Sequence, residues 1–146
     1  MRTALLALSL LFPHTAVADP DRLSFLLGSY HASPAQEFEE FNPGVFLTWE
    51  GQVDTTVGLF RNSYGRAALS ATADWTLYER DRFAFSVFAG AAYYPGDGDR
   101  FRIHLGDLIP LAGLQARFGP TFVQLLPSDG AQTDGVLTFG VTFPLN

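Results

Sequence analysis

A histidine and a serine of this chain, His31 and Ser63, have side chains suited to general-base or nucleophilic chemistry. The choice of histidine is narrow, because histidine is scarce in the sequence. Only three histidines occur in the 146 residues, and two of them, His31 and His104, follow the first eighteen residues. His31 follows the first stretch of alternating apolar residues, and Ser63 follows a later one. An imidazole beside a serine hydroxyl can activate that hydroxyl or assist acyl transfer. Both are also ordinary loop residues, so the elements that position them must decide between the two interpretations.

Charged residues surround this candidate pair. Arg61 and Arg66 flank the dipeptide Asn62-Ser63, and a guanidinium group is suited to contact with a lipid phosphate. An acidic run at residues 37–40 precedes them. We interpret that run as a solvated loop.

The sequence predicts neither a metal site nor a cofactor. No cysteine is present, which excludes zinc fingers, iron–sulfur sites and disulfide scaffolds. His104 stands beside Arg100, Arg102 and Asp107 near the start of a strand. That setting favours a packing or rim role for this histidine.

Most of the chain alternates between large apolar and small or polar residues at a period of two, which is typical of β-strands. The alternation predicts strands at 23–28, 45–49, 55–60, 69–78, 83–93 and 137–143. Two less regular segments, 101–117 and 120–126, bring the number to eight. Within 69–78, one face is expected to carry Ser70, Thr72, Asp74, Thr76 and Tyr78. No stretch has the pattern of an amphipathic helix, so the expected fold class is all-β.

The connections between these strands alternate in length. Segments 50–52, 79–82 and 117–120 are short, whereas 30–43, 62–66, 94–100 and 127–134 are longer. Short turns at one end and longer loops at the other are typical of outer-membrane barrels. Up-and-down topology then places His31 and Ser63 at the same rim.

The two faces of the strands differ in a way that a soluble fold does not explain. Large apolar residues share one face and small or polar residues the other, whereas a soluble sandwich or lipocalin exposes its polar face. We therefore predict an eight-stranded antiparallel up-and-down transmembrane β-barrel, with a soluble β-sandwich as the alternative. Its interior holds side chains or one small ligand and is not an open channel. Aromatic residues near strand ends are expected to form interfacial girdles: Trp49, Trp75, Tyr78, Tyr93 and Tyr94.

The first eighteen residues have the features of a secretory signal peptide. Arg2 precedes an apolar stretch at residues 4–12, and Ala16-Val17-Ala18 is a small-residue cleavage site. We therefore expect a single barrel domain at 19–146. The formal net charge of −6 without a basic stripe argues against nucleic-acid binding. After residue 18 no apolar run reaches the roughly 20 residues of a membrane helix.

Three segments give the chain a resemblance to the PagP-like family of outer-membrane lipid A palmitoyltransferases. The first is Ser29-Tyr30-His31, followed by an acidic loop that ends in Phe41-Asn42-Pro43-Gly44. The second, Phe60-Arg61-Asn62-Ser63-Tyr64, is similar to the family's Phe-Lys-Asp-Ser-Trp segment. The third and most specific comprises Leu108-Ile109-Pro110-Leu111-Ala112, Phe118-Gly119-Pro120-Thr121-Phe122-Val123-Gln124 and Pro127.

The resemblance implies an enzyme that transfers an acyl chain from a phospholipid to lipid A or another lipid acceptor. His31 would be the general base, assisted by Ser63 and Asn62. Asn62 stands where the family usually has aspartate, so it can orient an imidazole but cannot stabilise imidazolium by charge. A loop glutamate would then have to substitute: Glu37, Glu39 or Glu40.

The resemblance also implies a lumenal acyl pocket with sideways access. Pro110 and Pro127 match prolines that interrupt pairing between the sixth and seventh strands, because proline removes a ladder donor. Small inward residues such as Gly90 leave room for the chain. Asp74 aligns with the glycine of the family's pocket floor, which predicts a shorter pocket, a different acyl chain or a different register.

Two other functions remain open. A small structural or adhesive barrel would keep the scaffold without the chemistry. A lipid A deacylase fits less well, because that family places a His-x-Ser motif late in the chain and no histidine follows His104. In all three cases we expect a monomer in the outer membrane, with lipid rather than nucleic-acid partners.

Overall fold

The computed structural model describes residues 18–127 and 132–145. The expected signal peptide at 1–18 lies outside the described residues except for Ala18. In the described part no helix is long and apolar enough to cross a membrane.

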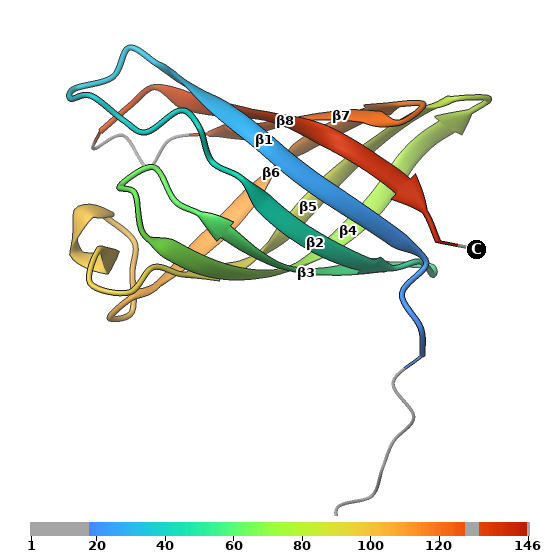
Figure 1. Ribbon diagram of the computed structural model, residues 1–146, viewed down its shortest axis with the longest axis horizontal. Coiled ribbons are helices and arrows are strands. Elements are labelled where there is room, and N and C mark those ends of the chain that lie inside the picture. Colours follow the sequence, from blue (N-terminus) through green and yellow to red (C-terminus); the bar gives the residue numbers. More distant parts are fainter. Residues whose placement is uncertain (1–17, 128–131, 146) are drawn as a thin grey trace, which may run out of the picture.

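The described residues form eight strands and one short 3₁₀ helix. The strands are β1 (Arg22–Ala32), β2 (Gly44–Trp49), β3 (Asp54–Arg61), β4 (Ala67–Arg80), β5 (Phe83–Tyr93), β6 (Leu108–Phe118), β7 (Thr121–Pro127) and β8 (Gly135–Pro144). Each strand pairs antiparallel with the next, and β8 pairs with β1, so the sheet closes into a barrel (Figure 1). The predicted eight-stranded antiparallel up-and-down barrel is confirmed.

The barrel has a loop end and a turn end, at opposite sides of Figure 1. The loop end carries the connections after β1, β3, β5 and β7, and the turn end carries the three tighter ones. Both described ends of the chain lie at the turn end. His31 and the segment that bears Ser63 therefore lie at the loop end, as the alternating connection lengths predict.

Alternation of residue types decides which side chains face the interior. In β8 the odd-numbered apolar residues such as Phe139 are exposed, while Gly140 and Thr142 are buried. In β5, Ala84, Ser86 and Phe88 are buried. The outer surface of the strands consequently exposes many large apolar side chains, among them Phe25, Leu27, Tyr30, Val45, Val57, Leu59, Leu69, Leu77, Leu114, Val123, Leu125, Leu137, Phe139 and Phe143.

One predicted face assignment in β4 is wrong because of a β-bulge. Thr76 pairs with Ser86, but Tyr78 pairs with Phe85, so one extra residue is inserted between them. An inserted residue reverses the alternation beyond it. Tyr78 therefore leaves the lumenal face, is 51% exposed and packs beside Phe83 on the outer surface.

The predicted strand at 101–117 begins later than expected. Residues 98–100 form the 3₁₀ helix η1 (Gly98–Arg100), and β6 begins only at Leu108. Tyr94 differs as well. It is 9% exposed and packs edge-on against Phe60 and Phe101 inside the loop end, so it is not a girdle residue. Burial raises the pKa of the Tyr94 hydroxyl, which keeps it protonated.

Candidate functional site: a histidine–serine pair at the mouth of the lumen

The structure brings His31 and Ser63 into direct contact at the loop end. His31 Nε2 lies 3.0 Å from Ser63 Oγ, which is hydrogen-bond distance. His31 is only 4% exposed. A general base must lie within this reach of the proton that it accepts. The pair that the sequence predicts therefore has the geometry that hydroxyl activation requires.

A bulge in β1 is what turns His31 inward. Leu26 pairs with Gly140, but Gly28 pairs with Phe139, so Leu27 is the extra residue. Two residues, Leu27 and Gly28, thus separate the inward-facing Leu26 from the next inward-facing residue, Ser29. His31, two residues further on, faces inward as well. With strict alternation from Phe25, His31 would lie on the outer surface.

The backbone of the first long loop explains why residue 28 is glycine. The Ser29 N–H donates to the Glu40 carbonyl oxygen at 2.9 Å, so the loop runs directly beside the bulge. A Cβ on Gly28 would lie 2.7 Å from that oxygen and 3.1 Å from the Phe139 ring. The close approach of loop and strand therefore requires the missing side chain.

A tight turn at residues 62–66 positions Ser63. The Asn62 N–H donates to the Arg66 carbonyl at 2.7 Å, and Asn62 Oδ1 accepts the N–H groups of Tyr64 and Arg66, each at 3.0 Å. The Ser63 carbonyl accepts the Glu39 N–H at 2.9 Å, which joins the turn to the first long loop. Ser63 is thus held by its own turn and by a neighbouring loop.

Asn62 lies in the site, but its oxygen is used differently from the sequence expectation. The sequence predicts that Asn62 orients the imidazole. Within the described residues, neither Asn62 Nδ2 nor His31 Nδ1 has a hydrogen-bond partner, so the two side chains do not bond to each other. Asn62 is 1% exposed and caps the turn that carries Ser63.

Aromatic and acidic residues fix the other side of the imidazole. The Phe38 ring stacks on His31 with centroids 4.2 Å apart and an interplanar angle of 11°. Glu37 and Glu40 line a hollow together with His31 and Phe38. Glu39 instead forms an ion pair with Arg61 at 3.0 Å. Of the three loop glutamates, Glu37 and Glu40 therefore share this hollow with His31, and the charge of Glu40 favours a positive imidazole.

A cavity of about 260 Å³ runs through the barrel interior and reaches both His31 and Ser63. Towards the loop end it is lined by many apolar side chains, including Leu26, Phe46, Phe60, Phe88, Ile109, Leu111, Leu126 and Val136, together with the polar Ser29, Asn42, Ser70 and Thr72. Towards the turn end its lining is polar, including Ser24, Thr48, Thr56, Thr76, Ser86, Gln115, Gln124 and Thr142. The two halves of the lumen therefore suit different ligands.

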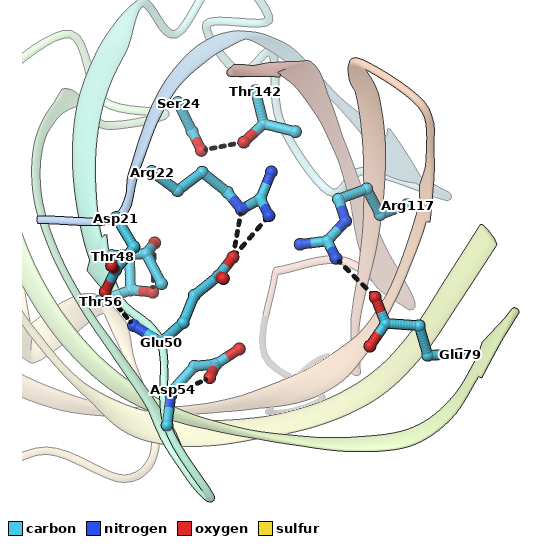
Figure 2. A network of polar contacts seen from close by, with 11 residues as sticks. Asp21, Arg22, Ser24, Thr48, Glu50, Asp54, Thr56, Glu79, Arg117 and Thr142 are labelled. Atoms are coloured by element: carbon cyan, nitrogen blue, oxygen red, sulfur yellow. Dashed lines mark hydrogen bonds and ion pairs between the residues drawn. The ribbon is translucent and has the colours of Figure 1, made fainter. Parts of the chain in front are cut away.

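The polar half is a network of paired side chains that point into the barrel (Figure 2). Arg22 forms an ion pair with Glu50, and Arg117 Nη2 lies 3.6 Å from Glu79 Oε1. A second layer consists of hydroxyl pairs: Ser24 with Thr142 at 2.8 Å, and Thr48 with Thr56 at 2.9 Å. This network closes the turn end of the lumen to an apolar chain, because desolvating so many polar groups is costly.

Of the two residues that the sequence assigns to the acyl pocket, Asp74 lines the cavity and Gly90 is not among its lining residues. Asp74 is 7% exposed and lines the cavity, where Oδ2 accepts a hydrogen bond from Thr72 Oγ1 at 3.2 Å. Gly90 permits close contact between strands, because a Cβ there would lie 2.1 Å from the Ala71 carbonyl oxygen. In the sheet Asp74 lies between Asp54 of β3 and Phe88 of β5, and Ser70 and Thr72, on its loop-end side, also line the cavity.

The seam between β6 and β7 is paired over only part of its length. Residues 114–118 of β6 pair with 121–125 of β7, whereas 108–113 pair only with β5. Pro110 lies in the unpaired part of β6, and Pro127 ends β7. Both prolines line the cavity, so the split in the seam lies next to its apolar half.

The remaining sequence candidates lie at the same end of the barrel. Arg61 and Arg66 are 45% and 55% exposed, and each forms an ion pair within the protein. His104 is exposed in the segment before β6, where Nδ1 lies 3.0 Å from the Gly106 carbonyl oxygen. No group of three or more potential metal-ligating side chains occurs in the described part of the chain.

The sequence reasoning missed Phe38 and Asp97 at this end, and it named Arg100 only as a neighbour of His104. Phe38 is one apolar residue in an acidic loop, and nothing in its spacing indicates that it stacks on the imidazole. Asp97 and Arg100 fall in a Gly-Asp-rich segment that reads as an ordinary loop. The spacing of Asp97 and Arg100, three residues apart, is the one signal that could have indicated an ion pair.

Comparison of the chain with protein-family models and with curated proteins finds no match. The class defined by fold and site is an eight-stranded β-barrel with a histidine–serine pair at the mouth of its lumen.

Proposed function

We propose that this protein is an outer-membrane acyltransferase of the lipid A palmitoyltransferase type. The observation that carries the proposal is the 3.0 Å contact between His31 Nε2 and Ser63 Oγ at the apolar end of a barrel lumen. The catalytic pair and a slot for an acyl chain lie together. The sequence resemblance to the family adds the substrate classes, a phospholipid donor and a lipid A acceptor.

In the proposed reaction, His31 is the general base. The acceptor hydroxyl gives its proton to Ser63 Oγ while Ser63 gives its own proton to His31 Nε2. The acceptor oxygen attacks the ester carbonyl of the phospholipid, and the resulting tetrahedral intermediate expels the lysophospholipid alkoxide. The imidazolium returns the proton to that leaving oxygen through Ser63, so no proton is gained or lost overall. Glu40 stabilises the imidazolium in the interval.

The cavity and the split seam support binding of the acyl chain. The apolar lining near His31 can hold a hydrocarbon chain, and burial of each methylene contributes about 0.8 kcal/mol. The unpaired part of β6 beside Pro110 offers a sideways entrance from a surrounding bilayer. This entrance allows a lipid tail to enter while its headgroup stays at the loop end.

The outer surface supports placement in a membrane. Large apolar side chains are exposed on β1 through β8, an arrangement that fits contact with lipid better than contact with water. The signal-like segment at 1–18 adds an export route. We therefore propose that the loop end faces the outside of the cell, because outer-membrane barrels place their longer loops there.

Mass spectrometry of lipid A from cells that produce the protein tests this function. A gain of one acyl chain is expected for the transferase. Loss of one chain would indicate a deacylase, and an unchanged spectrum would indicate a barrel without this chemistry. His31→Ala and Ser63→Ala should each lower the gain by about 10²–10⁴-fold, whereas His104→Ala, which replaces the exposed histidine, should leave it unchanged.

A further inference from the structure

Two arginine side chains converge on one buried carboxylate at the loop end. Arg66 Nη1 lies 3.5 Å from Asp97 Oδ1, and Arg100 Nε lies 2.9 Å from the same oxygen. The Asp97 side chain is 1% exposed, whereas those of Arg66 and Arg100 are 55% and 44% exposed. Among the described residues, no other carboxylate forms an ion pair with either arginine. Within this group of three side chains, two guanidinium charges face one carboxylate, which leaves one positive charge in excess; Asp99 is exposed beside Arg100 in the same segment, and the whole chain carries −6.

Local structure holds both guanidinium groups in place. Arg66 Nη1 also donates to the Pro95 carbonyl at 3.2 Å. Glycine suits residue 96, because its φ is +74°, a conformation that other residues rarely adopt. The Arg100 guanidinium lies 4.5 Å from the centre of the Tyr64 ring. A ligand that binds here meets two arginines whose conformations are already restricted.

The arginine cluster is linked to the catalytic pair through Tyr64. Tyr64 follows Ser63 in the chain and packs edge-on against Phe38, which stacks on His31. Arg66 closes the turn that positions Ser63, since both its N–H and its carbonyl bond to Asn62. One layer of side chains therefore separates the cluster from Ser63.

Arg61, at the same end of the barrel, is less suited to binding a second anion. Its guanidinium forms an ion pair with Glu39 at 3.0 Å, and both side chains are about equally exposed, at 45% and 41%. That pair is neutral and open to water. Arg66 and Arg100 share a single buried carboxylate, so their outward N–H groups remain available to a second anion.

We propose that Arg66 and Arg100 together bind a phosphate group on the headgroup of a lipid substrate. Paired guanidinium groups present N–H donors that match phosphate oxygens, and the excess positive charge attracts the anion. Asp97 holds the two arginines together and does not contact the phosphate. The identity of the lipid as a substrate rests on the proposed function, whereas phosphate binding does not.

The test follows the Nε–Hε NMR signals of the arginines in the full barrel, folded in maltoside micelles or in phosphatidylcholine nanodiscs. Inorganic phosphate is titrated into the micelles, and the nanodiscs are prepared with and without phosphatidic acid. The signals of Arg66 and Arg100 should shift with phosphatidic acid, and Arg80, exposed at the turn end, should not respond. Arg66→Gln and Arg100→Gln should each weaken binding about 10-fold or more, and Arg80→Gln should not weaken it.

Each outcome decides one part of the proposal. A response to inorganic phosphate without a response to phosphatidic acid would overturn the headgroup assignment, and no response to either would overturn the site. Arg100→Lys keeps the charge and folding but loses the planar guanidinium, so it should bind less tightly than wild type and more tightly than Arg100→Gln. The NMR signals report binding without catalysis. If the barrel binds phosphate but transfers no acyl chain, the proposed function is disproved and the phosphate site is not.

Discussion

At residue 62 the chain has an asparagine that shapes the site through the backbone. Its Oδ1 accepts two N–H groups of the turn, and its own N–H bonds back to Arg66. Asparagine and aspartate both favour such turns because the side-chain oxygen mimics a backbone acceptor. Asn62, which stands where the family that the chain resembles usually has aspartate, therefore keeps the position of Ser63, and we expect Glu40 to supply the charge near His31.

Substitution of Asn62 separates these two roles. Asn62→Ala removes the acceptor of two backbone N–H groups and should destabilise the folded barrel by about 1–3 kcal/mol. It should also lower acyl transfer, because Ser63 loses its fixed place. Asn62→Asp keeps the acceptor oxygen and should keep both the turn and the activity. Urea unfolding followed by tryptophan fluorescence measures the stability, and an Asn62→Ala barrel as stable as wild type would contradict the capping role.

At the scale of the strands, two β-bulges decide which residues face the lumen. Leu27 is the extra residue of β1 and Leu77 that of β4. The bulge at Leu27 lies four residues before His31, and it reverses the faces of residues 28–31 relative to strict alternation. The second lies near the turn end, where it moves Tyr78 outward.

Deletion of the extra residue should undo each reversal. Removal of Leu27 restores strict alternation in β1, so His31 should leave the lumen, lose Ser63 and lose acyl transfer. Removal of Leu77 changes the same kind of feature far from the site and should leave transfer within a few-fold of wild type. Heat-modifiable migration on gels verifies that both variants fold, and an active Leu27-deletion barrel would refute the role of the bulge.

The sequence predicts the strands better than the faces at their ends. Alternation in residues 83–93 and 137–143 identifies β5 and β8, because large residues dominate one face and small or polar residues the other, with Phe88 as an exception in β5. A bulge leaves no such mark, since the extra Leu27 is as apolar as its neighbours. Tyr94 is misassigned for a related reason: an aromatic residue one position past a strand can turn inward, and only packing against Phe60 decides it.

The candidate site was predictable in its residue types but not in its contacts. His31 and Ser63 stand out because histidine is rare and both follow alternating segments. Their distance depends on the bulge and on the turn at 62–66. The contact of Asp97 with Arg66 joins loops that are about 30 residues apart in the chain, and no local pattern indicates it.

For the molecule as a whole, the proposed membrane position makes a prediction about the outer surface. Val57 lies near the middle of β3, is 39% exposed and should contact lipid. Val57→Arg should destabilise the barrel in bilayers by about 2–4 kcal/mol, the cost of arginine near a bilayer midplane. Leu105→Arg, at a residue 80% exposed in a loop, should cost little. If both variants unfold like wild type in vesicles, the surface of β3 does not face lipid.

The contrast between the two halves of the lumen makes the last prediction, which concerns the acyl chain. A hydrocarbon tail that enters from the His31 end passes apolar side chains, with Ser70 and Thr72 among them, before it reaches Asp74. Hydroxyl pairs and the Arg22–Glu50 and Arg117–Glu79 ion pairs lie beyond (Figure 2). Extension past this point would cost the desolvation of polar groups without compensating bonds. Asp74→Ala should therefore shift the preferred donor towards longer acyl chains, whereas Asp74→Asn, which keeps a polar side chain of equal size, should not. Mass spectra of the lipid product with mixed-chain phospholipid donors measure the shift, and an unchanged chain length in Asp74→Ala would mean that the limit lies elsewhere in the lumen.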